Sequence, residues 1–184
     1  MSVWNPETGH WDPLAWGVSD SATAIHHKLT LGELEMARII TAQNAEESES
    51  NGCRDKFAAA DATPEERHTR NLVGWAGEIA ASTVLDVEWP GGLTGPGYDL
   101  PPDIAVRTRD AVAAAPWEPD LCFRPRDDVA LRYLHVVARL PHVWLTGWLY
   151  GHECQGLGTE GHSGGRLVWY VRQDKLRRMD TWVT

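Results

Sequence analysis

The sequence predicts an α+β domain with a mixed sheet. Two observations carry this prediction. Apolar residues recur at helical spacing only in the first half of the chain, and after Val87 they fall into short runs and alternations typical of strands. A block of helices followed by strands favours an α+β arrangement over alternating βαβ units. With 184 residues, of which 42% are hydrophobic, the chain has the length and composition of a single globular domain, expected over residues 29–184.

Residues 1–28 are expected to form an irregular arm in front of that domain. Trp4, Trp11 and Trp16 lie there among Gly, Pro and Ser without a regular period. Because tryptophan side chains bury large areas, they are expected to pin the arm to the domain. The other interpretation is an exposed Trp-rich surface for a partner.

The first helix has clear start and stop signals. Thr30 and Glu33 form the Thr-x-x-Glu pattern of a capping box, and Asn51-Gly52 is expected to end the helix. Residues 53–62 are expected to form a loop.

The second helix is expected to begin at Thr63-Pro64-Glu65-Glu66 and to run to about Leu85. That start combines a capping threonine, a proline at the first helical position and a glutamate at the third. Gly74 and Gly77 lower the helix propensity, which predicts a close approach to a neighbouring sheet.

The remaining elements are mostly strands. We expect them near residues 103–109, 120–124, 133–140, 143–150 and 167–171, with a short helix at 173–179. The Gly-rich residues 151–165 predict a mobile loop or an insertion. Trp144, Trp148 and Trp169 are expected to pack in the core, with stacking on nucleic-acid bases as the alternative.

Acidic residues are concentrated in the first half of the chain. Residues 1–100 hold 6 basic and 16 acidic side chains, a net charge of −10, and residues 101–184 hold 11 basic and 10 acidic ones, a net charge of +1. The two halves together give the net charge of −9 of the whole chain. A polyanion is therefore expected to meet the second half, where Arg109, Arg124 and Arg126 are the candidates for nucleic-acid contacts.

The segment from Asp99 to Arg109 carries the strongest functional signal. At strand period, Asp103, Ala105 and Arg107 point to one face, and the residues between them point to the other. Metal-assisted phosphodiester cleavage needs carboxylates that converge on a divalent cation and a basic group for the developing charge. Glu78, Asp99 and Asp103 are the candidate catalytic and metal-binding carboxylates, with Arg107 as the basic catalytic group.

Three short motifs resemble the PD-(D/E)XK nuclease-like superfamily, and more narrowly phage-encoded proteins of that type. They are Gly77-Glu78, Gly97-Tyr98-Asp99 and Val106-Arg107-Thr108-Arg109. The resemblance covers roughly residues 29–180 and implies a restriction-endonuclease-like core. It matches Asp99 with the family's metal-binding aspartate and Glu78 with its helix carboxylate.

Two positions depart from the family pattern. Ala105 stands where the second carboxylate is expected, which removes a metal ligand. Arg107 stands where a lysine is expected, and arginine keeps the charge but not the compact, titratable ammonium group. Asp103, two residues earlier on the same face, or Asp120, on the next strand, could replace the missing carboxylate.

Three functions follow as hypotheses. The leading one is a phage accessory protein with a degenerate nuclease-like core, which binds nucleic acid or a host protein without cutting. The second is an active deoxyribonuclease that uses Mg²⁺ or Mn²⁺ on Glu78, Asp99 and Asp103. The third is an acidic host-takeover or anti-defence factor that docks on a host protein through its negative first half.

The sequence also predicts where in the cell the protein is found. No apolar run approaches the length of a membrane span, and no signal pattern opens the chain, so we expect a protein of the host cytoplasm without a membrane partner. The three cysteines never stand in a CxxC pair, which argues against a disulfide framework or a structural zinc site.

Overall fold

Three short strands precede two long helices, and mostly strands follow. The computed structural model describes residues 4–5, 10–11, 23–50, 63–88, 103–110, 120–163 and 165–182. The helices are α1 (Leu31–Ser50), α2 (Pro64–Leu85) and α3 (Gly151–Leu157), with 3₁₀ turns η2 (Gln173–Lys175) and η3 (Met179–Thr181). The strands are β1 (Trp4–Asn5), β2 (His10–Trp11), β3 (Ile25–Lys28), β4 (Ile104–Asp110), β5 (Leu121–Phe123), β6 (Arg132–Arg139), β7 (His142–Tyr150), β8 (Thr159–Ser163) and β9 (Arg166–Val171).

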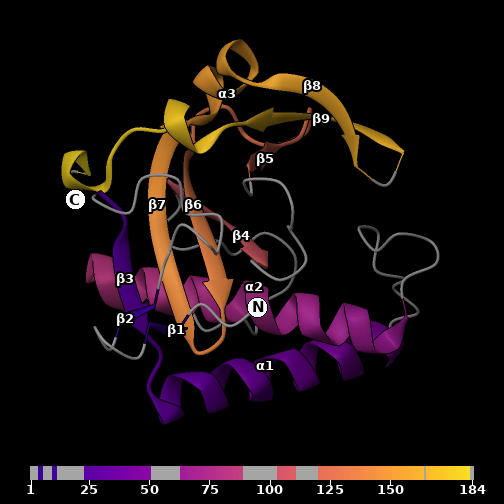
Figure 1. The fold of residues 1–184 in the computed structure, drawn as a ribbon. Coiled ribbons are helices and arrows are strands. Elements are labelled where there is room, and N and C mark those ends of the chain that lie inside the picture. Colours follow the sequence, from indigo (N-terminus) through magenta and orange to yellow (C-terminus); the bar gives the residue numbers. More distant parts are fainter. Residues whose placement is uncertain are drawn as a thin grey trace.

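A four-stranded mixed sheet forms the centre of the fold. Its strand order is β3-β7-β6-β4, with β4 parallel to β6 and the other pairs antiparallel. A second sheet of order β5-β9-β8 is antiparallel, and β1 pairs with β2. The predicted α+β class with a mixed sheet is confirmed. Figure 1 shows α2 along one side of the four-stranded sheet, α1 beyond α2, and the second sheet at the opposite end of the molecule.

Strand β4 contributes to two apolar clusters, one on each face. Ile104 and Val106 belong to the cluster that includes the buried residues of α2, whereas Ala105 packs with Leu121 and Tyr133 in the other. The predicted alternation of these three residues is confirmed. Residues 107 and 109 continue the Ala105 side, so they point away from α2.

Gly77 is the point at which α2 comes closest to β4. A Cβ atom at Gly77 would lie far inside van der Waals contact with the Thr108 side chain. The predicted close approach is therefore confirmed at this position. It is wrong for Gly74, where an added Cβ would meet no described atom within 4 Å.

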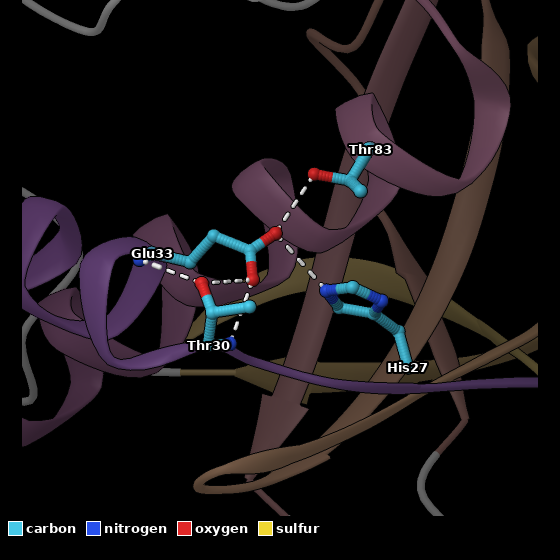
Figure 2. Close-up of polar contacts among 4 residues, drawn as sticks. All are labelled: His27, Thr30, Glu33 and Thr83. Carbon is cyan, nitrogen blue, oxygen red and sulfur yellow. Dashed lines mark hydrogen bonds and ion pairs between the residues drawn. The ribbon is translucent and has the colours of Figure 1, made fainter.

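Glu33 joins three elements (Figure 2). Its Oε2 accepts hydrogen bonds from the Thr30 backbone N–H at 2.7 Å and the Thr30 hydroxyl at 2.8 Å, which completes the predicted capping box of α1. Its Oε1 lies 2.9 Å from the Thr83 hydroxyl on α2 and 3.0 Å from His27 Nε2 on β3. Burial acts to raise the pKa of Glu33, but the hydrogen bonds from Thr30, Thr83 and His27 outweigh it, and the pKa is lowered.

The second capping box, in α2, is local. Thr63 and Glu66 exchange the predicted hydrogen bonds, with the Thr63 backbone N–H 2.8 Å from Glu66 Oε2. The helix runs from Pro64 to Leu85, as predicted, and Asp86 ends it in the left-handed conformation.

Two expectations for the second half are wrong. Residues 151–163 form α3 and β8 rather than a loop. The helix is stabilised by Glu153, whose carboxylate accepts the Tyr150 backbone N–H at 3.0 Å and pairs with Arg177 at 2.7 Å. The short helix expected at 173–179 is two separate 3₁₀ turns.

The predicted N-terminal arm, residues 1–28, ends inside the sheet. Its last four residues form β3, which pairs antiparallel with β7. The side chains of Trp4, Trp11 and Trp16 lie outside the described residues, as does the loop predicted at 53–62. None of the described helices has the length and apolar character needed to cross a membrane.

Gly77→Ala should destabilise the protein, and Gly74→Ala on the same helix is its control. Overpacking against Thr108 is expected to cost about 1–3 kcal/mol, whereas alanine at position 74 should stabilise by up to about 1 kcal/mol. Urea unfolding measures both changes. Equal effects of the two substitutions would contradict the close approach.

Glu33→Gln should lower the free energy of unfolding at neutral pH by about 1–2 kcal/mol, because a charged acceptor of several hydrogen bonds is removed. The lowered pKa means that this stabilisation is present above the ordinary carboxyl value of 4.5 and is lost as the pH falls below it. Denaturant unfolding at neutral and acid pH should show the two proteins converging in acid. Glu66→Gln is the control and should have the smaller effect, because Thr63 is its only hydrogen-bond partner among those that the structure identifies in the described chain.

Candidate functional site

The candidate site lies on the face of β4 that points away from α2. Arg107 and Arg109 project from this face, and Arg124 follows β5, which covers part of it. Arg126 lies in the exposed turn after β5. We call Arg107, Arg109 and Arg124 the arginine cluster.

Asp127 joins two members of the arginine cluster, Arg107 and Arg124. Its Oδ1 lies 3.2 Å from Arg107 Nη2, and its Oδ2 accepts the Arg124 backbone N–H at 2.9 Å. The Asp127 side chain is only 8% exposed, so the pair with Arg107 is little screened by solvent. The Arg107 guanidinium also lies over the Tyr133 ring, 5.0 Å from its centroid. These contacts fix Arg107 between β4, β6 and the turn after β5.

Arg109 is held at the other end of the cluster. Its Nε donates to the Asp120 carbonyl oxygen at 3.2 Å, and its guanidinium lies 5.9 Å from the centre of the Tyr170 ring. Burial lowers the pKa of Arg124, and the charge of Arg107 lowers it further, with Asp127 acting in the opposite direction. The positive charges are therefore close enough to influence one another.

The cysteine beside the cluster is not an activated nucleophile. Burial raises the pKa of the Cys122 thiol, although the charges of Arg109, Arg124 and Arg107 oppose that shift. Burial also raises the pKa of Cys154 to about 12. Both thiols are therefore protonated at neutral pH.

His135 adds a buried imidazole to the same face. It is the register partner of Arg107 on the neighbouring strand, and its Nδ1 lies 2.6 Å from Thr146 Oγ1. Burial and the charge of Arg109 lower the pKa of His135 to about 3, so the ring is neutral. His135 Nε2 and Arg107 Nε are buried and have no hydrogen-bond partner within the described part of the chain.

Of the three predicted metal ligands, the structure describes Glu78 and Asp103. Glu78 lies on α2, on the opposite side of β4 from Arg107, and is half-buried. Asp103 is 56% exposed and forms an ion pair with Arg132. Asp99 lies outside the described residues. Among the residues that are described, no three His, Cys, Asp or Glu side chains are placed to hold a metal ion.

Ala105 is enclosed in apolar packing. It is 0% exposed and packs with Leu121, Phe123 and Tyr133. A carboxylate at this position would be buried among apolar side chains, at a high desolvation cost. The position at which the family pattern expects a metal ligand is here part of the core.

Asp103, just before β4, forms two contacts with Arg132. Its backbone carbonyl accepts the Arg132 N–H at 2.7 Å, and its carboxylate pairs with the Arg132 guanidinium. Arg132 in turn lies 4.5 Å from the centre of the Trp182 ring. These contacts direct Asp103 toward the first residue of β6 and the C-terminal turn. Asp120, the other proposed replacement, is half-buried beside Arg109.

Sequence reasoning missed Asp127 and His135. Asp127 stands in a turn between charged residues, and His135 stands in an apolar run, so neither has a local signal. The strand register that places His135 beside Arg107 is a tertiary property. The expectation that Trp144 and Trp148 pack in the core is confirmed, since both are buried.

Comparisons of the chain with protein-family models, with curated proteins and with solved structures find no match. The proposed function therefore rests on the residues of the site.

Asp127→Asn should destabilise the protein by about 3 kcal/mol, because it leaves the Arg107 guanidinium without its buried counter-charge. Asp180→Asn is the matched control, since Asp180 pairs with Arg178 at an exposed position, and its effect should stay within about 0.5 kcal/mol. Denaturant unfolding measures both. An equally small effect of the two substitutions would show that Asp127 does not organise the cluster.

Proposed function

We propose that this chain is a phage accessory protein with a degenerate PD-(D/E)XK nuclease-like core, which binds nucleic acid through its phosphates without cleaving it. The observation that carries the proposal is the arginine cluster on one face of β4 and beside β5. Arginine guanidinium groups pair with phosphate oxygens in a bidentate manner, and phosphate contacts dominate nucleic-acid affinity.

The surroundings of the cluster support binding. Asp127 and the Tyr133 ring hold Arg107 in place before a ligand arrives, so little side-chain entropy is lost on binding. Arg126, which acts electrostatically on Arg124, lies in the exposed turn beside the cluster. The cluster is also separated from the acidic helix α1, because α2 packs on the other side of β4 and α1 lies beyond it (Figure 1).

Ala105 and Asp103 argue against cleavage. Ala105 is enclosed in an apolar cluster, and Asp103 is paired with Arg132. Arg107 is an arginine whose charge is already matched by Asp127. Each of these observations argues against a metal site formed by two carboxylates around β4.

The test is binding of a labelled DNA strand of about 20 nucleotides, single-stranded and as a duplex, followed by fluorescence anisotropy at several salt concentrations. Wild-type protein should bind with an affinity that falls as salt rises. Arg124→Gln combined with Arg126→Gln should weaken binding and reduce the slope of log K against log salt by about 0.7–0.9 for each phosphate that the variant no longer neutralises.

Arg178→Gln is the control for the loss of one exposed positive charge, because Arg178 is exposed and pairs with Asp180. It should leave the salt slope unchanged. No binding of either DNA form at low salt would overturn the proposal and favour a protein partner. Cleavage of the DNA in Mn²⁺, abolished in Asp99→Asn, would establish the nuclease hypothesis instead.

A further inference from the structure

A second group of basic residues lies at the opposite edge of the four-stranded sheet. His26 and Lys28 on β3 are the register partners of Trp144 and His142 on β7, and His142 is also the register partner of Arg139 on β6. Directly paired residues point to the same face of a sheet. We call His26, Lys28, Arg139 and His142 the histidine patch.

The histidine patch shares its face with the arginine cluster. Val137 on β6 is the register partner of both Arg109 on β4 and Trp144 on β7. Residues 26, 144, 137 and 109 therefore form one row across all four strands. Basic side chains thus stand at both ends of this row, with the buried Val137 and Trp144 between them, whereas α2 packs against the other face (Figure 1).

Two imidazoles form the centre of the patch. His26 Nε2 lies 3.0 Å from His142 Nδ1, so the neutral rings share one N–H···N hydrogen bond. The ring planes differ by 10°, and the His26 ring also packs 5.0 Å from the Trp144 ring, centre to centre. His142 is 7% exposed, whereas His26 and Lys28 are exposed. The outer imidazole and the lysine are accessible, and the inner imidazole supports them.

The charges around this pair disfavour its protonation in the free protein. Burial lowers the pKa of His26, and the charges of His27 and Lys28 lower it further. Burial also lowers the pKa of His142, together with His26 and Lys28. Arg139 is the register partner of His142 on β6, and Glu33 is bonded to His27, which lies on the other side of β3.

We propose that the histidine patch is a second phosphate contact, which engages when the His26–His142 pair takes up a proton, so that nucleic-acid affinity rises as the pH falls. The proposal rests on the nucleic-acid binding argued above and adds its regulation by pH. A phosphate near the patch would add a negative charge beside the two imidazoles, which favours their protonated form. Binding and protonation are linked, so each favours the other.

The lowered pKa values of His26 and His142 determine how DNA affinity changes with pH. In the free protein the two pKa values lie below the ordinary histidine value of 6.5, so the pair is neutral at pH 7 and above. A bound phosphate raises them. The gain in affinity is therefore absent well above pH 6.5 and grows as the pH falls below that value.

The experiment measures DNA affinity by anisotropy at about pH 8 and about pH 5.5, with a salt series at each pH. Wild-type protein should bind about tenfold more tightly at the lower pH, with a salt slope steeper by about 0.7–0.9, the increment of one phosphate contact. His26→Gln should keep the affinity at the higher pH and lose most of the gain. His68→Gln, an exposed histidine on α2, is the matched control and should keep the whole gain.

Calorimetric titration in two buffers of different ionisation enthalpy supplies a second readout. Proton uptake on DNA binding near the ordinary histidine pKa of 6.5 is expected for the wild type and should be reduced in His26→Gln. Circular dichroism checks that each variant is folded. Lys28→Gln changes an exposed member of the histidine patch, so it tests the patch with little effect on packing.

The outcomes are separable. Loss of all DNA binding at the higher pH would overturn the proposed function. Binding at the higher pH together with an equal gain in His26→Gln and His68→Gln would overturn only the role of the histidine patch, and would assign the pH effect to the general charge of the protein.

Discussion

The contact between Gly77 and Thr108 is the constraint on which the arrangement of the site depends. Without a side chain at position 77, α2 approaches β4 closely enough to bury Ile104 and Val106 on one face of this strand. Ile104 and Val106 fill the space beneath the helix, and strand geometry then turns Ala105, Arg107 and Arg109 to the other face. The close packing of α2 therefore decides on which side of the sheet the arginines lie.

The same division separates the charges of the molecule. α1 and α2 carry much of the acidic excess, and Glu33 ties both of them to β3 through His27 and Thr83. The opposite face of the sheet carries the arginine cluster and the histidine patch. The sheet therefore stands between Glu33 and these two groups of basic residues.

Local interactions were predictable from the sequence, and non-local ones were not. The boxes Thr30–Glu33 and Thr63–Glu66 form because their partners stand three residues apart, and the start of α2 followed from that pattern. The helix at 151–157 was not predicted because its glycines suggested a loop, whereas Glu153 is held by Arg177, 24 residues away. For the site, the alternation of Ala105 and its neighbours was predictable from strand period, but the pair between Arg107 and Asp127 and the position of His135 depend on tertiary packing.

The packing around Ala105 also positions Arg107. A carboxylate at this position would need a metal ion or hydrogen-bond donors to offset its burial, whereas alanine lets Leu121, Phe123 and Tyr133 close around it. That apolar contact brings the Tyr133 ring to Arg107 and places the turn that carries Asp127 beside it. The Asp127 carboxylate matches the charge of Arg107. Ala105 thus supports the packing in which Asp127 and Tyr133 position Arg107.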